Sequence, residues 1–228
     1  MGLVRGLVAP FRGIAFIARR GLWGYLVLPL VLNAGLAALS VWLGFRLVRE
    51  KLGPEWLASS PAVAGIIVIV LAGLAGLLFF VVLQPVVGAP FVDLLSEKTE
   101  RVLRGHVPSV GFVRSAALAV FHGLLKAVLY GFALAVVLLL GAISGVGGGL
   151  GVALYAIFLA FDGFDYPLSR RGVSFAGKWR YLAQHPAQTL GYCVGASVLY
   201  LVPLAALVAP SFMAVGATLV YLDDEPLP

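Results

Sequence analysis

Four long stretches of the chain are dominated by apolar residues and contain no Asp, Glu, Lys or Arg. A helix rises about 1.5 Å per residue, so roughly 20 such residues cross a hydrocarbon core of about 30 Å. An ionised side chain at the centre of that core costs about 2.5–3.5 kcal/mol, which keeps membrane helices free of charge. The pattern therefore predicts membrane-embedded helices within Leu22–Phe45, Trp56–Val92, Ala127–Phe161 and Tyr181–Leu222.

Two of these stretches each predict one full transmembrane helix. Residues 22–45 are long enough for one crossing, and they lack the small-residue cleavage site of a signal peptide, so we expect them to remain in the mature chain. In the second stretch, residues 63–83 predict another crossing. A start signal at Ser59-Ser60-Pro61 precedes it and Gln84-Pro85 closes it.

The other two stretches are interrupted. Residues 127–161 contain the glycine cluster Gly145–Gly149, which leaves 18 apolar residues before it and 12 after it. Residues 188–222 are split near Pro203 into limbs of about 15 and 18 residues. Because limbs of this length fall short of a full crossing, we predict two re-entrant, or hemipenetrating, helical hairpins. The alternative is that each stretch forms one or two full, kinked crossings.

Polar segments connect the apolar stretches. Residues 1–20 carry Arg5, Arg12 and Arg19 at a spacing of seven, which places them on one side of a helix and predicts an interfacial basic helix in the lipid headgroup plane. The predicted fold class is thus an all-α integral membrane protein, a single membrane domain over residues 1–228 with interfacial amphipathic helices.

Two further segments are expected to face water. Residues 93–104 predict an exposed amphipathic helix with two ion pairs at i,i+4 spacing, Glu97–Arg101 and Glu100–Arg104. Residues 169–184 are expected to lie along the cytoplasmic face. Between the third apolar stretch and this segment, Asp165-Tyr166-Pro167 is interpreted as a loop turn.

Composition supports a membrane protein. Apolar residues make up 61% of the chain and charged residues 11%, against about 25% charged in an average soluble domain. This excludes an ordinary soluble enzyme and a disordered tail, and the single Cys193 excludes an internal disulfide. The net charge of +6 then indicates an anionic membrane surface rather than nucleic acid.

The basic residues also predict the orientation of the chain. With two crossings and two re-entrant hairpins, 13 Lys and Arg residues lie on the side of the N-terminus. The opposite loop carries only Arg46, Arg49 and Lys51. The positive-inside rule places the N-terminus of this multi-pass protein in the cytoplasm.

The sequence offers no candidate for catalysis, cofactor binding or metal binding. It contains no phosphate-binding loop, dinucleotide fingerprint or hydrolase motif, and its histidines, His106, His122 and His185, lie far apart. We therefore expect no enzyme activity. Glycines four residues apart, as at Gly191 and Gly195, predict close helix packing, either within the chain or between subunits.

One group of residues predicts anion binding. Arg19, Arg20, Gly21 and Leu22 stand directly before the first transmembrane helix. Free backbone N–H groups at a helix start favour an anion, and two guanidinium groups add bidentate donors. The alternative is that these arginines fix the orientation of the helix and bind lipid headgroups.

Short motifs in one order along nearly the whole chain resemble the CysZ-type bacterial sulfate permeases, which are related to the eukaryotic etoposide-induced membrane proteins. They are Gly21-Leu22, Tyr25-Leu26, Leu28-Pro29-Leu30 and Asn33; Ala89-Pro90-Phe91, Leu95 and Glu97-Lys98; Asp165-Tyr166-Pro167, Arg171-Gly172 and Ser174-Phe175; and Pro203, Pro210, Ala214 and Gly216-Ala217-Thr218.

The resemblance implies two long crossings, two hemipenetrating hairpins and a homo-oligomer that moves sulfate inward for cysteine biosynthesis. It also implies that neither ATP hydrolysis nor a cofactor takes part. The family's anion site is associated with a Gly-Leu-Arg motif. Gly21 and Leu22 match this motif, but Trp23 stands in place of the arginine, and a tryptophan has no guanidinium fork.

Two functions remain open from the sequence. The first is a passive or gradient-driven permease for sulfate or a related oxyanion. The second is a non-transporting membrane scaffold that binds partners or lipids through its basic face.

Overall fold

In the part of the chain that it describes, the computed structural model consists of helices joined by turns, without strands. That part comprises residues 2–59, 65–66, 69–70, 73, 90–105, 107, 121, 123–126, 128–133, 135–137, 139, 147–202, 205 and 207–225. The chain divides into two units, residues 30–88 and the remaining residues 1–29 with 89–228. The prediction of an all-helical protein is confirmed for these residues, whereas the predicted crossing at 63–83 lies mostly outside them.

The first predicted crossing lies within α2, Gly24–Ser59, which is 36 residues long. Its segment Gly24–Gly44 is long and apolar enough to cross a membrane. Val27, Val31 and Val41 on this segment are each more than half exposed. Exposed apolar side chains on a helix of this length are suited to contact with lipid.

The stretch at 127–161 folds back on itself. A helix spanning Gly123–Val137 runs antiparallel to α5, Gly147–Arg170, because Tyr130 stacks on Phe158 at a centroid distance of 4.2 Å while Val137 lies against Gly151. This register places the reversal of the chain between Val137 and the start of α5, whereas Gly147–Gly149 of the predicted break belong to the first turn of α5 and residues 140–146 lie outside the described part. The limited depth of this hairpin in the membrane stays a prediction.

The predicted end of this hairpin is wrong. The helix does not stop at Phe161 after 12 residues but continues to Arg170, which makes α5 24 residues long. Its segment Gly149–Arg170 is the second helix that is long and apolar enough to cross a membrane. The helix continues because Asp162 and Asp165 are neutralised by lysines, so they do not need to turn out to water.

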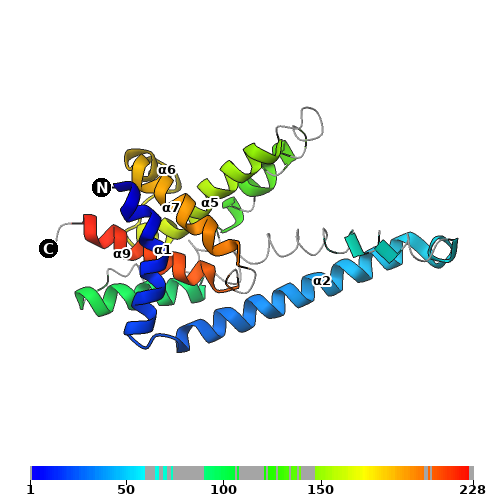
Figure 1. Ribbon diagram of the computed structural model, residues 1–228, viewed down its shortest axis with the longest axis horizontal. Helices are drawn as coiled ribbons and strands as arrows, with labels where there is room; N and C mark the ends of the chain where they lie inside the picture. Colours follow the sequence, from blue (N-terminus) through cyan, green and yellow to red (C-terminus); the bar gives the residue numbers. More distant parts are fainter. Residues whose placement is uncertain are drawn as a thin grey trace. The chain divides into compact units, whose positions relative to one another are not determined.

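The stretch at 188–222 also forms two helices of opposite direction. They are α7, Pro186–Tyr200, and α9, Ala209–Asp224, of 15 and 16 residues, so each is at most about 24 Å long. Both pack on α1, Gly2–Arg19, and a short α6, Phe175–Gln184, precedes α7 (Figure 1). The predicted break and limb lengths agree with these helices.

Glycines hold α1 against its two neighbours at backbone distance. A Cβ on Gly191 of α7 would lie 2.0 Å from the carbonyl oxygen of Leu3, and a Cβ on Gly216 of α9 would lie 2.2 Å from that of Ala9. The sequence left open whether Gly191 and Gly195 pack within the chain or between subunits; in the structure both pack on α1. The interfacial location of α1 stays a prediction, but one of its faces is buried within the protein.

We expect Gly191→Ala to lower the free energy of unfolding by about 1–3 kcal/mol, because the new methyl group collides with a backbone carbonyl that can move only with α1. Denaturant titration in mixed micelles measures this loss. Gly35→Ala in α2 is the matched control, because nothing lies within 4 Å of the Cβ that it would add. Equal stability of the two variants would contradict the close packing.

Candidate functional site

The predicted anion site lies at the corner between α1 and α2. Gly21 has a φ of +65°, its N–H donates to Ala18 and the N–H of Leu22 donates to Ile17. These two bonds form a Schellman motif, the usual way in which a glycine ends a helix. The expectation that the amides of Gly21 and Leu22 are free for an anion is therefore wrong, because they close α1.

The two arginines of the predicted site are exposed at this corner. Nine of the ten acidic residues form ion pairs with basic residues elsewhere in the chain, and the tenth, Glu55, lies where side chains are not described. Among the described side chains, neither Arg19 nor Arg20 has an ion pair. Arg20 lies only over the ring of Phe16, at 6.0 Å. Two uncompensated cations thus stand beside the first turn of α2.

The other arginines of α1 are engaged within the protein. Arg5 donates to Asp224 at 2.8 Å and Arg12 donates to Asp223 at 2.9 Å, both at the end of α9. The basic row that was expected to face lipid headgroups is therefore neutralised at two of its three positions.

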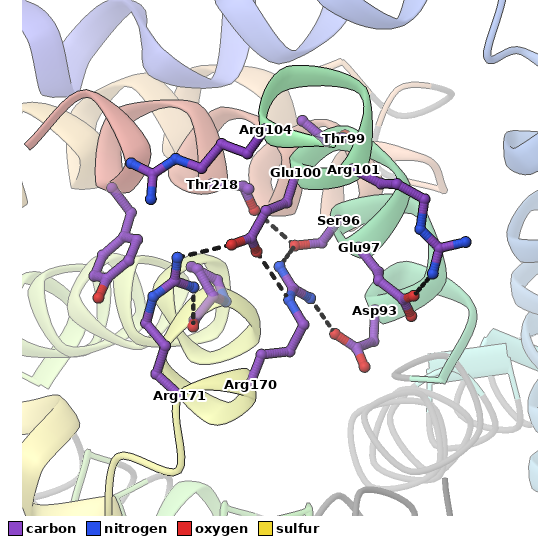
Figure 2. A network of polar contacts seen from close by, with 12 residues as sticks. Asp93, Ser96, Glu97, Thr99, Glu100, Arg101, Arg104, Arg170, Arg171 and Thr218 are labelled. Atoms are coloured by element: carbon purple, nitrogen blue, oxygen red, sulfur yellow. Dashed lines mark hydrogen bonds and ion pairs between the residues drawn. The ribbon is translucent and has the colours of Figure 1, made fainter. Parts of the chain in front are cut away.

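A buried ion network joins helix 90–104 to the end of α5 (Figure 2). Arg170 donates to Asp93 at 2.5 Å, to Ser96 at 2.7 Å and to Glu100 at 3.3 Å. Ser96 in turn lies 2.6 Å from the hydroxyl of Thr218 on α9. Because Arg170 contacts three groups of helix 90–104, it fixes that helix against α5, and the Ser96–Thr218 hydrogen bond links the same helix to α9.

Burial governs the electrostatics of this network. Glu100 is 0% exposed and accepts a second bond, from Arg171 at 2.7 Å. Burial raises the pKa of Asp93 above its ordinary value, and the charge of Arg170 partly offsets that rise. A carboxylate as deeply buried as that of Glu100 is tolerated because two guanidinium groups satisfy it.

Several predictions about these segments are wrong. Helix 90–104 is not a water-exposed helix, because Leu95, Ser96, Thr99 and Glu100 are buried. The Glu97–Arg101 pair is confirmed at 2.5 Å, but Arg104 donates to Glu225 at 2.6 Å while Glu100 binds Arg170 and Arg171. The spacing of Asp93, Ser96 and Glu100 at i, i+3 and i+7 carried the missing signal, since it aligns three polar groups on one helix face.

A second network lies along α5. Lys126 donates to Asp165 at 2.7 Å and to Asp162 at 3.2 Å, and Tyr130 donates to Asp162 at 2.8 Å. Lys178 of α6, 1% exposed, also binds Asp165. Asp165-Tyr166-Pro167 is therefore not a loop turn but part of α5. The segment 169–184 does not lie wholly at the surface either, because Arg170 and Lys178 are buried.

At the end of α9, Glu225 accepts three bonds from two arginines. Arg171 donates to it through Nε at 2.7 Å and through Nη2 at 2.5 Å, and Arg104 donates at 2.6 Å. The hydrogen bond from Arg171 lowers the pKa of Glu225 below its ordinary value of 4.5. Because the folded pKa is lowered, this contact stabilises the protein above pH 4.5 and is lost as the pH falls through the lowered pKa.

We therefore expect Glu225→Gln to melt at a lower temperature than the unchanged protein at pH 7, and the difference to shrink as the pH is lowered below about 4.5. Thermal unfolding in detergent, followed by circular dichroism between pH 7 and pH 3, tests this. A difference that grows toward acid would contradict the assigned direction of the pKa change.

Comparison with known proteins shows the family of this chain. Residues 9–210 match the model of the family described as sulfate transporter CysZ/etoposide-induced protein 2.4. A relative from Pectobacterium atrosepticum, named sulfate transporter CysZ, is 25% identical over 227 aligned positions, which cover 93% of this chain and 82% of the relative. The family is one of transporters rather than enzymes. The match covers most of the sequence, and the chain therefore belongs to the sulfate transporter CysZ/etoposide-induced protein 2.4 family.

Proposed function

We propose that this protein is a bacterial inner-membrane permease for sulfate or a related oxyanion, driven by the gradient of the anion and supplying sulfur for cysteine biosynthesis. The observation that carries the proposal is the charge of the α1–α2 corner. Among the other basic side chains that the structure describes, all but Lys98 and Arg180 pair with carboxylates, while Arg19 and Arg20 keep two adjacent charges in an exposed position beside a helix start.

In this proposal the two arginines attract the oxyanion and present it to the first turn of α2. A guanidinium group matches an oxyanion with two parallel N–H donors, and the positive end of a helix dipole adds to the attraction. Trp23, half exposed at this corner, stands where the family's arginine belongs. Arg19 and Arg20 take over the role of that arginine, while Gly21 and Leu22 give the corner its shape.

The anion then passes between the two pairs of antiparallel helices, Gly123–Val137 with α5 and α7 with α9. We further propose that the protein works as a homo-oligomer in contact with membrane lipids and with its N-terminus in the cytoplasm. The ion networks along α5 support the proposed path of the anion between the helix pairs. They hold the helices together with balanced charges, so an anion crossing nearby does not meet unpaired buried carboxylates.

Uptake of radiolabelled sulfate by proteoliposomes tests the proposal. We expect uptake above that of protein-free liposomes, driven by an inward sulfate gradient without ATP, and no net uptake when sulfate is equal on both sides. Absence of uptake by protein that retains its helical circular dichroism would contradict the permease and favour the scaffold.

A further inference from the structure

The end of α9 contains a cradle for an anion that the proposed entrance does not use. Glu225 stands just after α9 in an extended conformation, and its carboxylate lies between the guanidinium groups of Arg104 and Arg171. Its side chain is 28% exposed, whereas those of Arg104 and Arg171 are 14% and 13% exposed. The anion in this cradle is thus supplied by the protein and borders on solvent.

The orientation of Arg171 does not depend on Glu225. Its Nη1 donates to the carbonyl of Pro167 at 3.1 Å, its Nη2 donates to the buried Glu100 at 2.7 Å, and its guanidinium lies 4.5 Å from the ring centroid of Tyr221. These contacts hold the edge formed by Nε and Nη2 toward the position of the Glu225 carboxylate.

Arg104 is held in a similar way. Its Nη2 donates to the carbonyls of Leu222 and Glu225, each at 3.0 Å, at the end of α9. Its Nη1 is left to contact the carboxylate at 2.6 Å. If the Glu225 carboxylate withdrew, the guanidinium groups of Arg104 and Arg171 would both face the position that it leaves. One positive charge would then be uncompensated there, because Glu100 still balances the charge of Arg171.

We propose that Arg104 and Arg171 form a second oxyanion site, which Glu225 occupies as an internal competitor. A tetrahedral oxyanion, either free sulfate or the phosphate of a lipid headgroup, offers the fork of Arg171 the same pair of oxygens as a carboxylate does. A competitor tethered to the protein lowers its apparent affinity for an external anion, because that anion can bind only while the site is free of the competitor. This second site shares no residue with the proposed entrance at Arg19 and Arg20. The inference rests on the proposed function only in the choice of sulfate as the probe.

Calorimetry with sulfate tests the second site in a background that carries Arg19→Gln and Arg20→Gln. Because Glu225→Ala removes the competitor, we expect the sulfate affinity to rise about tenfold or more. Sulfate should also raise the melting temperature of the Glu225→Ala protein more than that of the background, since the anion restores the missing bonds. Glu97→Ala is the matched control, because it removes a carboxylate from the exposed pair with Arg101.

The test has three further arms. Adding Arg104→Gln to Glu225→Ala should abolish the gain in sulfate affinity. If the Arg104→Gln protein does not fold, Arg104→Lys takes its place. The lysine keeps the positive charge but lacks the paired N–H donors of a guanidinium group, so it should retain only part of the gain. Repeating the measurement in nanodiscs of phosphatidylglycerol and of phosphatidylcholine separates the two ligands. Sulfate binding that is lost only in phosphatidylglycerol identifies the headgroup as occupant, and binding retained in both identifies free sulfate. An unchanged affinity in Glu225→Ala, or a gain that survives both Arg104 variants, overturns the proposal.

Discussion

Glu100→Gln is expected to lower the free energy of unfolding by about 3–5 kcal/mol, the usual cost of removing one partner from a buried ion pair. Glu100 has no exposed surface and accepts from both Arg170 and Arg171. The glutamine keeps the volume of the side chain but leaves these two guanidinium groups in the interior with one charge too few opposite them. Denaturant titration in mixed micelles measures the loss.

Glu97→Gln is the control for this change. It lies one turn earlier on the same helix and removes a carboxylate from an i,i+4 pair whose arginine side chain is 57% exposed. Exposed pairs of this kind contribute less than about 1 kcal/mol. If Glu100→Gln costs as little as Glu97→Gln, the buried network does not hold helix 90–104 in place.

The largest effect on activity is expected from replacing Arg19 and Arg20 together by glutamine. The initial rate of sulfate uptake into proteoliposomes should fall about tenfold or more, because two charge-assisted donors and the attraction they exert on the anion are lost. The fold should be unaffected, since neither side chain has an ion pair within the described residues. Melting temperature and helical circular dichroism check that expectation.

Arg101→Gln is the matched control for the charge of the protein. Arg101 is also exposed, but Glu97 neutralises it, so its loss should leave uptake close to that of the unchanged protein. A similar fall in uptake for Arg101→Gln and the Arg19/Arg20 variant would mean that overall charge, rather than the α1–α2 corner, sets the rate.

The breaks between helices were accessible from the sequence because glycine and proline act locally. The glycine cluster at 145–149 overlaps the start of α5 at Gly147, and the split near Pro203 separates α7 from α9. The end of α5 was not accessible. In the sequence, two aspartates followed by a proline are typical of a loop. The helix continues through them because Lys126 and Lys178, which are distant in sequence, neutralise Asp165.

The candidate site was predicted in part. The arginines at 19 and 20 are exposed as expected, but the φ of Gly21 and the two bonds that close α1 depend on where that helix ends. The packing of α1 was missed for a related reason. Its arginines predicted an interfacial helix, while the opposing glycines that bury it, Gly191 and Gly216, lie about 200 residues away on α7 and α9.

Binding of sulfate to purified protein, measured by calorimetry in detergent, is the most direct test of the claim that the uncompensated arginines of the α1–α2 corner hold the oxyanion. The account predicts saturable binding to the unchanged protein and to Arg101→Gln. Exchanging Arg19 and Arg20 for glutamine should weaken this binding about tenfold or more. Equal heats of binding for all three proteins, or none for any of them, would contradict it.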